Sequence, residues 1–271
     1  MLKLLLKLLF IGPCFVAQAA GYLPFAGAEA MAMGNSTLPG QNAFTAINNH
    51  SLMPWQKHKG IGISLTNRFG MADVNRAVVA GVVPYKNFGY GMKLTHYGNN
   101  AYSEQSIGLS VAHAFNEKLA IGCGADYQSI AIAGYGHRGV VMAEISLSAK
   151  VSEQLLMACR VYNPTRAKFS DYSDERLATI WQMGLQYKVN AQVKTVVEVE
   201  KSNAFAANIK GGVDYTPAKD VHLRMGFSTL QPQFTFGFGF KYKQCQFEAA
   251  SAIHQTLGVS SNLSVLFEVG H

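Results

Sequence analysis

The sequence predicts an all-β fold, an antiparallel transmembrane β-barrel of about 14 strands with a short N-terminal plug segment. Three observations predict it. The chain opens with an export-type segment, and from Gly60 onward amphipathic runs of about ten residues alternate with turn residues. No later stretch reaches about 18 consecutive apolar residues, so a membrane-embedded chain has only the closed sheet with which to satisfy its backbone polar groups.

The first residues have the layout of a secretory signal. Lys3 and Lys7 make a positive start, an apolar run extends to Val16, and residues 17–19 supply the small side chains that a signal peptidase needs. We therefore expect residues 1–19 to be a removed signal peptide, residues 20–59 a plug segment and residues 60–271 the barrel.

Composition narrows the function classes. Hydrophobic residues make up 49% of the chain and charged residues only 14%, which suits a soluble all-β protein or a barrel surrounded by lipid. Cys123, Cys159 and Cys245 are odd in number and widely spaced, so they predict neither a disulfide framework nor a zinc site. The net charge of +7 comes from scattered residues without a binding motif, so we expect no nucleic-acid partner, no cofactor and no metal.

Hydrophobic alternation carries the fold prediction. Ile61, Ile63 and Leu65 alternate with small or polar residues, and the run 234–242 places five aromatic side chains on one face. A soluble β-sandwich with its apolar face inward has the same period. The membrane interpretation is favoured because fourteen such strands would give a soluble sheet more apolar face than it could cover.

The connections are expected to alternate in length. The turns at 84–87, 116–118, 152–154 and 216–220 are predicted to be short and periplasmic, whereas the links 98–104, 129–138 and 163–175 are predicted to be long and external. Aromatic residues near the strand ends are expected to form an interfacial girdle, and they are Trp55, Trp181, Tyr85, Tyr187, Tyr215 and Tyr242.

Ionisable residues fall on the inward parity of the strands. They could line a polar route through the barrel, or pair across the lumen and help to fill it. Pairing is favoured because buried charges are usually kept by being paired. The predicted lumen-facing residues are Arg68, Lys93, Glu144, Arg160, Lys194, Glu198, Glu200, Lys210, Asp214, Arg224, Lys241 and Glu248.

Catalysis receives little support from the sequence. His113, on the outward parity, and His222, on the inward parity, are candidate bases for an enzyme acting on lipid esters. No Gly-x-Ser-x-Gly elbow or His-Glu-x-x-His motif accompanies them. We expect a protein that is not an enzyme and has no catalytic residues.

The segment before the first strand resembles a known family. Residues 26–35 (AGAEAMAMGN) and 42–49 (NAFTAINN) resemble the opening of the FadL-like outer-membrane barrels, particularly the PorV/PorQ group associated with type IX secretion in Bacteroidota. The resemblance implies that this segment folds into the barrel as a plug, with Met31, Met33, Gly34, Asn48 and Asn49 in it. Where the family usually has Asn-Pro-Ala-Gly-Leu, residues 49–53 read NHSLM, which puts contacts made by that motif in doubt.

The resemblance also implies a location and a function. We expect an outer-membrane barrel that acts as a non-enzymatic accessory of type IX protein secretion or a related assembly, with outer-membrane lipid and a translocon or its cargo as partners. One alternative is a FadL-like passive channel for small hydrophobic molecules, with a lateral opening where the glycine-rich stretches 87–91 or 237–239 kink a strand. A second alternative is a lipid-modifying enzyme.

Overall fold

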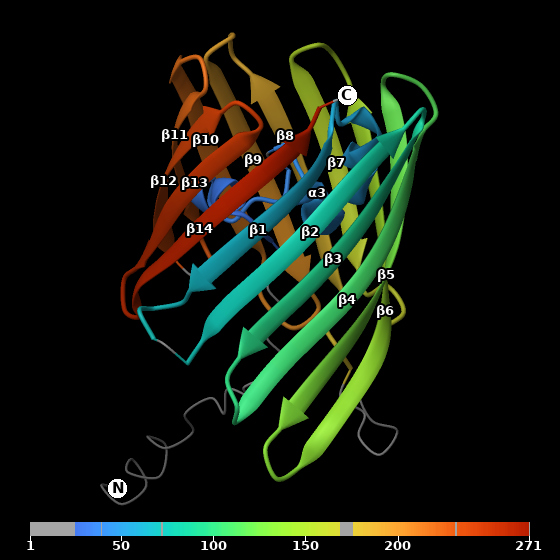
Figure 1. Ribbon diagram of the computed structural model, residues 1–271, viewed down its shortest axis with the longest axis vertical. Coiled ribbons are helices and arrows are strands. Elements are labelled where there is room, and N and C mark those ends of the chain that lie inside the picture. The colour runs from blue at the N-terminus through green and yellow to red at the C-terminus, as the bar shows by residue number, and fades with distance from the viewer. Residues whose placement is uncertain (1–24, 39, 72, 169–175, 231, 271) are drawn as a thin grey trace, which may run out of the picture.

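The computed structural model describes residues 25–38, 40–71, 73–168, 176–230 and 232–270. The predicted signal peptide, residues 1–19, lies outside the described residues. Within them, β-strands form a barrel that encloses two short α-helices and a 3-10 helix (Figure 1).

Fourteen antiparallel strands make one closed barrel, which confirms the predicted fold class and strand number. Each strand pairs with its neighbours in the sequence, and β1 closes the barrel against β14. The strands are β1 Lys59–Asn67, β2 Asn75–Tyr85, β3 Phe88–Gly98, β4 Tyr102–Ala114, β5 Leu119–Ile132, β6 Gly136–Lys150, β7 Leu155–Tyr162, β8 Ile180–Lys188, β9 Val193–Ser202, β10 Asn208–Ala218, β11 Val221–Ser228, β12 Gln233–Tyr242, β13 Cys245–His254 and β14 Gly258–Val269.

The closing pair shows how register sorts the side chains. In the β1–β14 ladder, Ile61 lies opposite Phe267 and Ile63 opposite Val265, and all four side chains are exposed. Because side chains alternate between the two faces of a strand, one register sends every apolar member of the pair outward.

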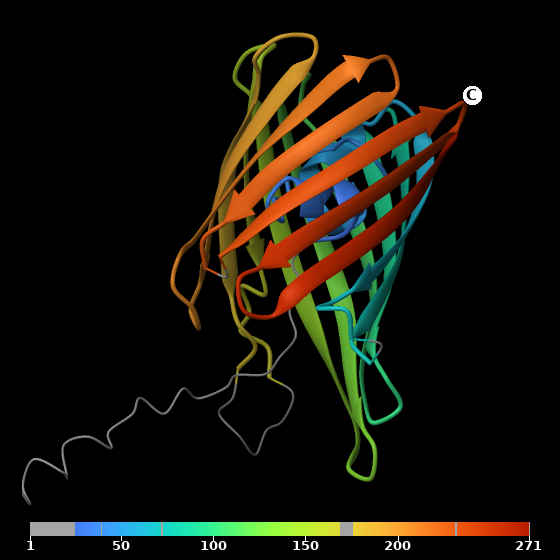
Figure 2. The same ribbon diagram turned by 90° about the vertical axis from the view of Figure 1, so that its left-hand side faces the viewer.

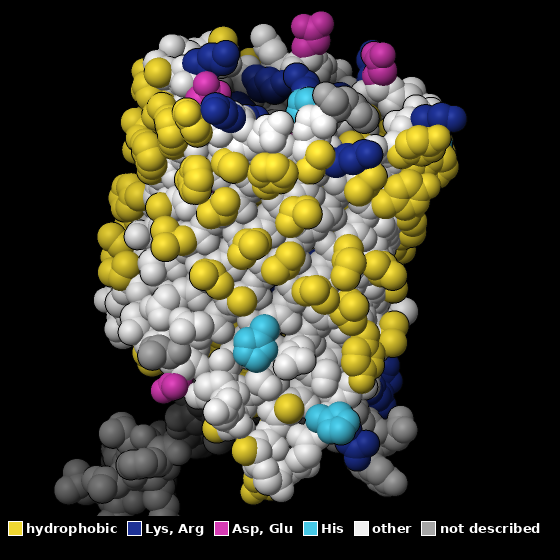
Figure 3. All heavy atoms as spheres, viewed as in Figure 1, with side chains coloured by type: hydrophobic (Ala, Val, Ile, Leu, Met, Phe, Trp, Pro, Cys, Tyr) yellow, Lys and Arg dark blue, Asp and Glu magenta, His cyan; other side chains and the backbone are white. Residues whose placement is uncertain are grey.

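The outside of the barrel is apolar. Leu109, Val141 and Phe234 are each more than 60% exposed, and hydrophobic side chains cover the visible face as a broad band (Figure 3). A soluble barrel would turn this face inward, so the outward apolar face is the side that meets lipid. No helix within the described ranges is long and apolar enough to cross a membrane.

The two ends of the barrel differ. We call the end that holds the start of β1 and the end of β14 the turn end, because its six links span only two to four residues. The opposite, loop end has links of three to seventeen residues. The prediction of long links at 98–104 and 129–138 was wrong, since β3–β4 and β5–β6 are joined by three residues each and the β5–β6 hairpin projects far beyond its neighbours (Figure 1). Strand pairing in these two hairpins continues beyond the apolar band. Apolar and polar residues no longer alternate there, so the sequence pattern did not reveal the extra strand residues.

The N-terminal residues 25–38 and 40–58, here called the inner segment, lie inside the barrel (Figure 2). They contain α2 (Ala28–Ala32), α3 (Thr45–Asn48) and the 3-10 helix η1 (His50–Trp55). Phe44, Leu52 and Met53 are almost completely buried. The helices are short because turns interrupt them, as at Gly34, whose φ of 74° favours glycine.

Glycines on the inner wall bring the inner segment into contact with the strands. A Cβ on Gly226 would lie 2.3 Å from the backbone nitrogen of Gly34, and one on Gly89 would lie 2.5 Å from the Cβ of Met53. The predicted kinks at 87–91 and 237–239 were wrong, because β3 and β12 pair with both neighbours there without a register shift. Gly89, Gly91 and Gly237 leave space for the inner segment instead, and Gly239 leaves space for Arg224.

We therefore expect Gly226→Ala to destabilise the barrel. The added methyl would press on backbone atoms of the inner segment, which cannot rotate away, and such overpacking typically costs about 1–3 kcal/mol. Gly81→Ala is the matched control, because its nearest atom would lie 3.8 Å away. The measurement is the midpoint temperature of unfolding in detergent, seen on a gel as the shift from the band of the folded barrel to that of the unfolded chain. Equal midpoints for both variants would contradict the packing argument.

Candidate functional site

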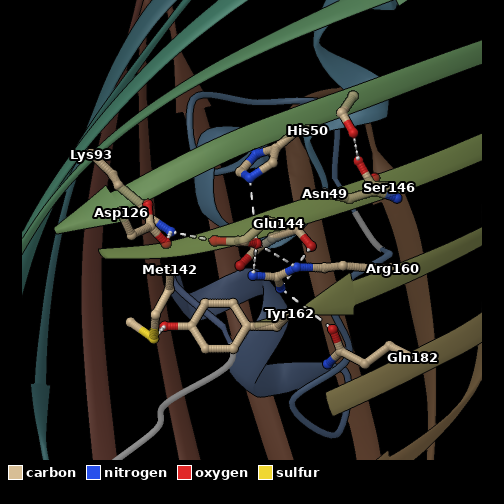
Figure 4. A network of polar contacts seen from close by, with 12 residues as sticks. Asn49, His50, Lys93, Asp126, Met142, Glu144, Ser146, Arg160, Tyr162 and Gln182 are labelled. Atoms are coloured by element: carbon tan, nitrogen blue, oxygen red, sulfur yellow. Dashed lines mark hydrogen bonds and ion pairs between the residues drawn. The ribbon is translucent and has the colours of Figure 1, made fainter. Parts of the chain in front are cut away.

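The interior contains a buried cluster of charged residues around Glu144 (Figure 4). The Nζ of Lys93 lies 2.7 Å from Glu144 Oε1 and 2.7 Å from Asp126 Oδ2. Arg160 donates to Glu144 Oε2 from Nε at 2.8 Å and from its terminal nitrogen at 2.5 Å. His50 Nε2, from the inner segment, lies 3.4 Å from the same oxygen. We call these five residues the Glu144 cluster.

Neighbouring strands position the cluster. Lys93 comes from β3, Asp126 from β5, Glu144 from β6 and Arg160 from β7, all on the inward parity. Gly108 on β4 lies directly between Lys93 and Asp126, and a Cβ there would lie 2.0 Å from Asp126 Oδ1. The absence of a side chain at Gly108 lets Lys93 reach across β4.

His50 is fully buried against this cluster. Burial lowers the pKa of His50, because a buried imidazolium loses its hydration; Glu144 opposes this shift, and the positive charges of Lys93 and Arg160 add to it. A neutral His50 therefore packs against a cluster whose two cations and two carboxylates balance.

A second cluster surrounds Lys210 on β10. Its Nζ lies 3.0 Å from Glu198 Oε1 and 2.7 Å from Glu200 Oε2. Glu198 also accepts hydrogen bonds from the backbone nitrogen and hydroxyl of Thr37, at 2.7 and 2.9 Å, which fixes the inner segment to β9. Gln182 donates to Glu200 and accepts from Arg160, so the two clusters are continuous.

A third cluster surrounds Arg224 on β11. Its guanidinium lies 2.9 Å from Glu248, 3.4 Å from Asp214 and 3.7 Å from Glu29, which belongs to α2. Lys194 Nζ lies 3.0 Å from Asp214. Charges of opposite sign again alternate, and each of the three clusters includes or contacts a residue of the inner segment.

Polar wall residues also satisfy the backbone of the inner segment. Short helices leave most of their N–H and C=O groups without intrahelical partners. Ser264 accepts from the Ala28 nitrogen at 2.9 Å, and Thr235 both accepts from the Gly34 nitrogen at 3.0 Å and donates to the Ala32 carbonyl at 2.8 Å. Hydroxyls of the wall thus replace the bonds that longer helices would make themselves.

The predicted lumen-facing residues fall into these clusters with two exceptions, Arg68 and Lys241. Arg68 lies beyond the end of β1, in the β1–β2 link, with its guanidinium 5.2 Å from the ring centre of Phe69. The prediction that Arg68 faces the lumen was wrong. It extended the alternation of β1 to residue 68, but strand pairing stops at Asn67. Lys241 lies near the turn end and pairs with Glu268. The residues placed inside, against the inner segment or one another, are Lys93, Glu144, Arg160, Lys194, Glu198, Glu200, Lys210, Asp214, Arg224 and Glu248.

The residues implied by the family resemblance are all buried, namely Met31, Met33, Gly34, Asn48 and Asn49. The Asn48 side chain bonds both the nitrogen and the oxygen of Ala26, at 2.8 and 2.9 Å, which ties α3 back to the start of the inner segment. Asn49 donates to Ser148 at 3.3 Å.

Sequence reasoning missed His50, Glu29 and Asp126. Asp126 shares the parity of Gly122 and Gly124, which could have identified it. His50 and Glu29 lie outside any strand, so no period marked them. Trp55 was wrongly expected in the girdle, since it belongs to η1 and its ring lies under Lys150, 4.1 Å from Nζ.

A small polar cavity lies between the inner segment and residues of strands β2–β5 and β7. Its volume is about 60 Å³, which is room for a few water molecules. Its charged lining consists of Arg76, Lys93, Glu104, Asp126 and Arg160. Among the described residues, no group of three or more His, Cys, Asp or Glu side chains is placed to hold a metal ion.

Similar solved structures include hydrocarbon channels. The monoaromatic hydrocarbon channel CymD superposes with a TM-score of 0.69 at 10% identity, covering 93% of this chain and 100% of that one. The Pseudomonas putida toluene transporter TodX gives 0.66 at 12% identity, covering 92% and 100%, and a Pseudomonas aeruginosa FadL homologue gives 0.67 at 11% identity, covering 90% and 98%. The fold is therefore that of the FadL-like outer-membrane barrels.

The sequence itself matches no family model and no curated protein. The structural similarity nevertheless extends past the barrel strands. Residues 59–271 are 213 of the 271 residues, or about 79%, so a match over 93% of the chain must include part of the inner segment.

Removing the central carboxylate should destabilise the folded barrel strongly. Glu144→Gln leaves Lys93 and Arg160 with Asp126 as the remaining anion, and breaking a buried ion pair on one side typically costs about 3–5 kcal/mol. The measurement is the free energy of unfolding in urea, with the gel shift reporting the folded fraction at each urea concentration. Glu117→Gln, in the exposed β4–β5 turn, is the control and should change little. A loss below about 1 kcal/mol for Glu144→Gln would refute the role assigned to the cluster.

Proposed function

We propose that the protein is an outer-membrane channel for small hydrophobic molecules, and that the inner segment holds it closed. The observation that carries the proposal is the similarity to CymD and TodX over nearly the whole chain, part of the inner segment included. CymD is described as a monoaromatic hydrocarbon channel and TodX as a toluene transporter. Compounds of that class are the first solutes to test here.

One sector of the lumen suits an apolar solute better than the rest. The ion clusters lie against β3–β7 and β8–β13, whereas β2 and β14 turn Val78, Ala80, Val82 and Leu266 inward. Ala43, Phe44, Ile47 and Met53 of the inner segment pack against this wall. A hydrophobic solute that moved through this apolar sector would avoid the cost of displacing paired charges.

The described state is closed in this sector. Phe44 and Met53 are almost completely buried, and β1, β2 and β14 are paired without interruption. Passage therefore requires the inner segment to shift away from β1 and β2. Because apolar contacts are not directional, they can be remade after each passage without finding new polar partners.

Two alternatives have weaker support. The accessory role in type IX secretion rests only on the resemblance of residues 26–53. For an enzyme, His222 contacts both Asp214 and Thr216 through the same nitrogen, Nδ1, so these contacts do not form a nucleophile–base–orienter relay. His113 packs on the outer surface between Phe88 and Phe115.

Deleting the gene should slow uptake of a monoaromatic hydrocarbon. At low external concentration we expect the initial rate of radiolabelled toluene uptake to fall several-fold and to recover with the wild-type gene, because the barrel supplies the route across the outer membrane. Uptake of a small sugar is the control and should stay the same. Unchanged toluene uptake would contradict the proposal; if secreted proteins then accumulated in the periplasm, the secretion role would replace it.

Tying the inner segment to β1 should block the apolar sector. A Cβ built on Gly60 lies 3.8 Å from the Cβ of Ala43, which is the spacing of a disulfide. In an Ala43→Cys/Gly60→Cys variant with the three native cysteines of the barrel replaced by serine, toluene uptake should fall under oxidising conditions and recover with a reductant. Each single-cysteine variant is a control. Equal uptake by the oxidised and reduced double variant would show that this part of the inner segment does not move.

A further inference from the structure

Lysines gather at the turn end of the barrel. Figure 3 shows basic side chains there, at the top of the view, beyond the apolar band. Ten lysines lie in or beside the links of this end against four acidic residues, Glu117, Glu153, Asp220 and Glu268. Seven of the lysines are exposed, namely Lys57, Lys59, Lys86, Lys118, Lys188, Lys219 and Lys243, and the other three are Lys150, Lys194 and Lys241. We call the seven exposed lysines the lysine rim.

The lysine rim lies where a membrane interface would be. Aromatic side chains at the ends of the same strands mark that level, as Tyr85, Tyr187 and Tyr242 do. Lys86 Nζ lies 5.4 Å from the ring centre of Tyr85, and Lys243 Nζ lies 5.4 Å from that of Tyr242. A lysine beside an interfacial ring can bury its stem along the ring and keep its ammonium at the headgroups.

Two of these lysines occupy costly backbone positions. The β2–β3 and β12–β13 turns have only two residues, and Lys86 and Lys243 adopt φ values of 52° and 54° there. Glycine or asparagine takes this left-handed conformation at lower cost. A lysine at both turns therefore indicates that its side chain contributes something that offsets the strain.

From this placement we propose that the lysine rim binds the anionic headgroups of phospholipids in the leaflet at the turn end. A ring of ammonium groups in the plane of the headgroups matches phosphate esters, and each lysine near an anionic bilayer surface adds to the attraction. The rim would thus hold the barrel at a fixed depth and surround it with anionic lipid. The inference requires only that the barrel lies in a bilayer, so it stands apart from the transport proposal.

The test is lipid selectivity measured by native mass spectrometry on the full processed protein in micelles. Phosphatidylglycerol and phosphatidylcholine of equal chain length compete for the protein. We expect wild type to retain phosphatidylglycerol at least about tenfold better, and about 0.5 M NaCl to reduce this preference, because salt screens exposed charges. A competing excess of inorganic phosphate should displace little lipid. The tyrosines beside the lysine rim also contact the acyl chains of the lipid, and phosphate cannot replace that contact.

The deciding variant combines Lys86→Gly, Lys243→Gly, Lys118→Gln, Lys188→Gln and Lys219→Gln. It should lose most of the preference for phosphatidylglycerol. It should fold at least as stably as wild type by the gel shift, because glycine removes the backbone strain at the β2–β3 and β12–β13 turns. The matched control changes five basic residues of the loop end and should keep the preference. Its substitutions are Arg68→Gln, Arg138→Gln, Arg176→Gln, Lys201→Gln and, at a φ of 52°, Arg166→Gly.

Four outcomes would overturn the proposal. They are a wild-type protein without lipid preference, a rim variant that keeps the preference, an equal loss of preference in both variants, and displacement of the lipid by inorganic phosphate alone. If the rim variant kept its lipid preference but lost an acidic periplasmic protein that co-purifies with wild type, the rim would be a protein-docking surface instead.

Discussion

The inner segment must be held inside the barrel by partners that the wall supplies, and the rest of the structure is arranged around that constraint. Its three short helices leave backbone groups unpaired, and Ser264 and Thr235 of the wall supply the missing partners. Glycines such as Gly226 bring strand and segment into backbone contact. The inward parity is therefore rich in glycine, hydroxyl and ionisable residues because each type meets one need of the enclosed segment.

Charge is handled differently on the two faces. Inside, carboxylates and cations alternate in continuous clusters, so that Glu144 meets both Lys93 and Arg160 and no buried charge of the cluster stands alone. Outside, the strands carry almost only apolar side chains, and the exposed lysines of the described residues, Lys201 apart, lie at the turn end. The apolar sector around Phe44 and Val82 is the largest apolar contact between the inner segment and the wall, and smaller ones join Met31 to β13 and Leu38 to β7. This difference is why the proposed route for a hydrophobic solute follows β1, β2 and β14.

The similarity to hydrocarbon channels and the polar character of much of the lumen are compatible on this view. The ion clusters fix one side of the inner segment through directional contacts, such as those of Thr37 with Glu198. The other side rests mainly on apolar contacts, joined by hydrogen bonds of Arg76 with the Phe25 carbonyl and of Ser264 with the Ala28 nitrogen. A segment held along one side by ion clusters and along the other mainly by apolar contacts can open a narrow path without leaving the barrel.

The sequence by itself determined the fold class, the strand number and the outward face, because a period of two repeated through fourteen strands leaves one closed arrangement in a bilayer. It also identified most inward charges, since parity is a local property of a strand. Only the tertiary structure decided which charges meet, that Arg68 and Trp55 lie elsewhere, and that His50 and Glu29 join the clusters. Those contacts link residues up to 219 positions apart, and strand periodicity carries no information about side chains of an irregular segment. The same reason explains the glycines at 87–91 and 237–239, whose role depends on what packs against them.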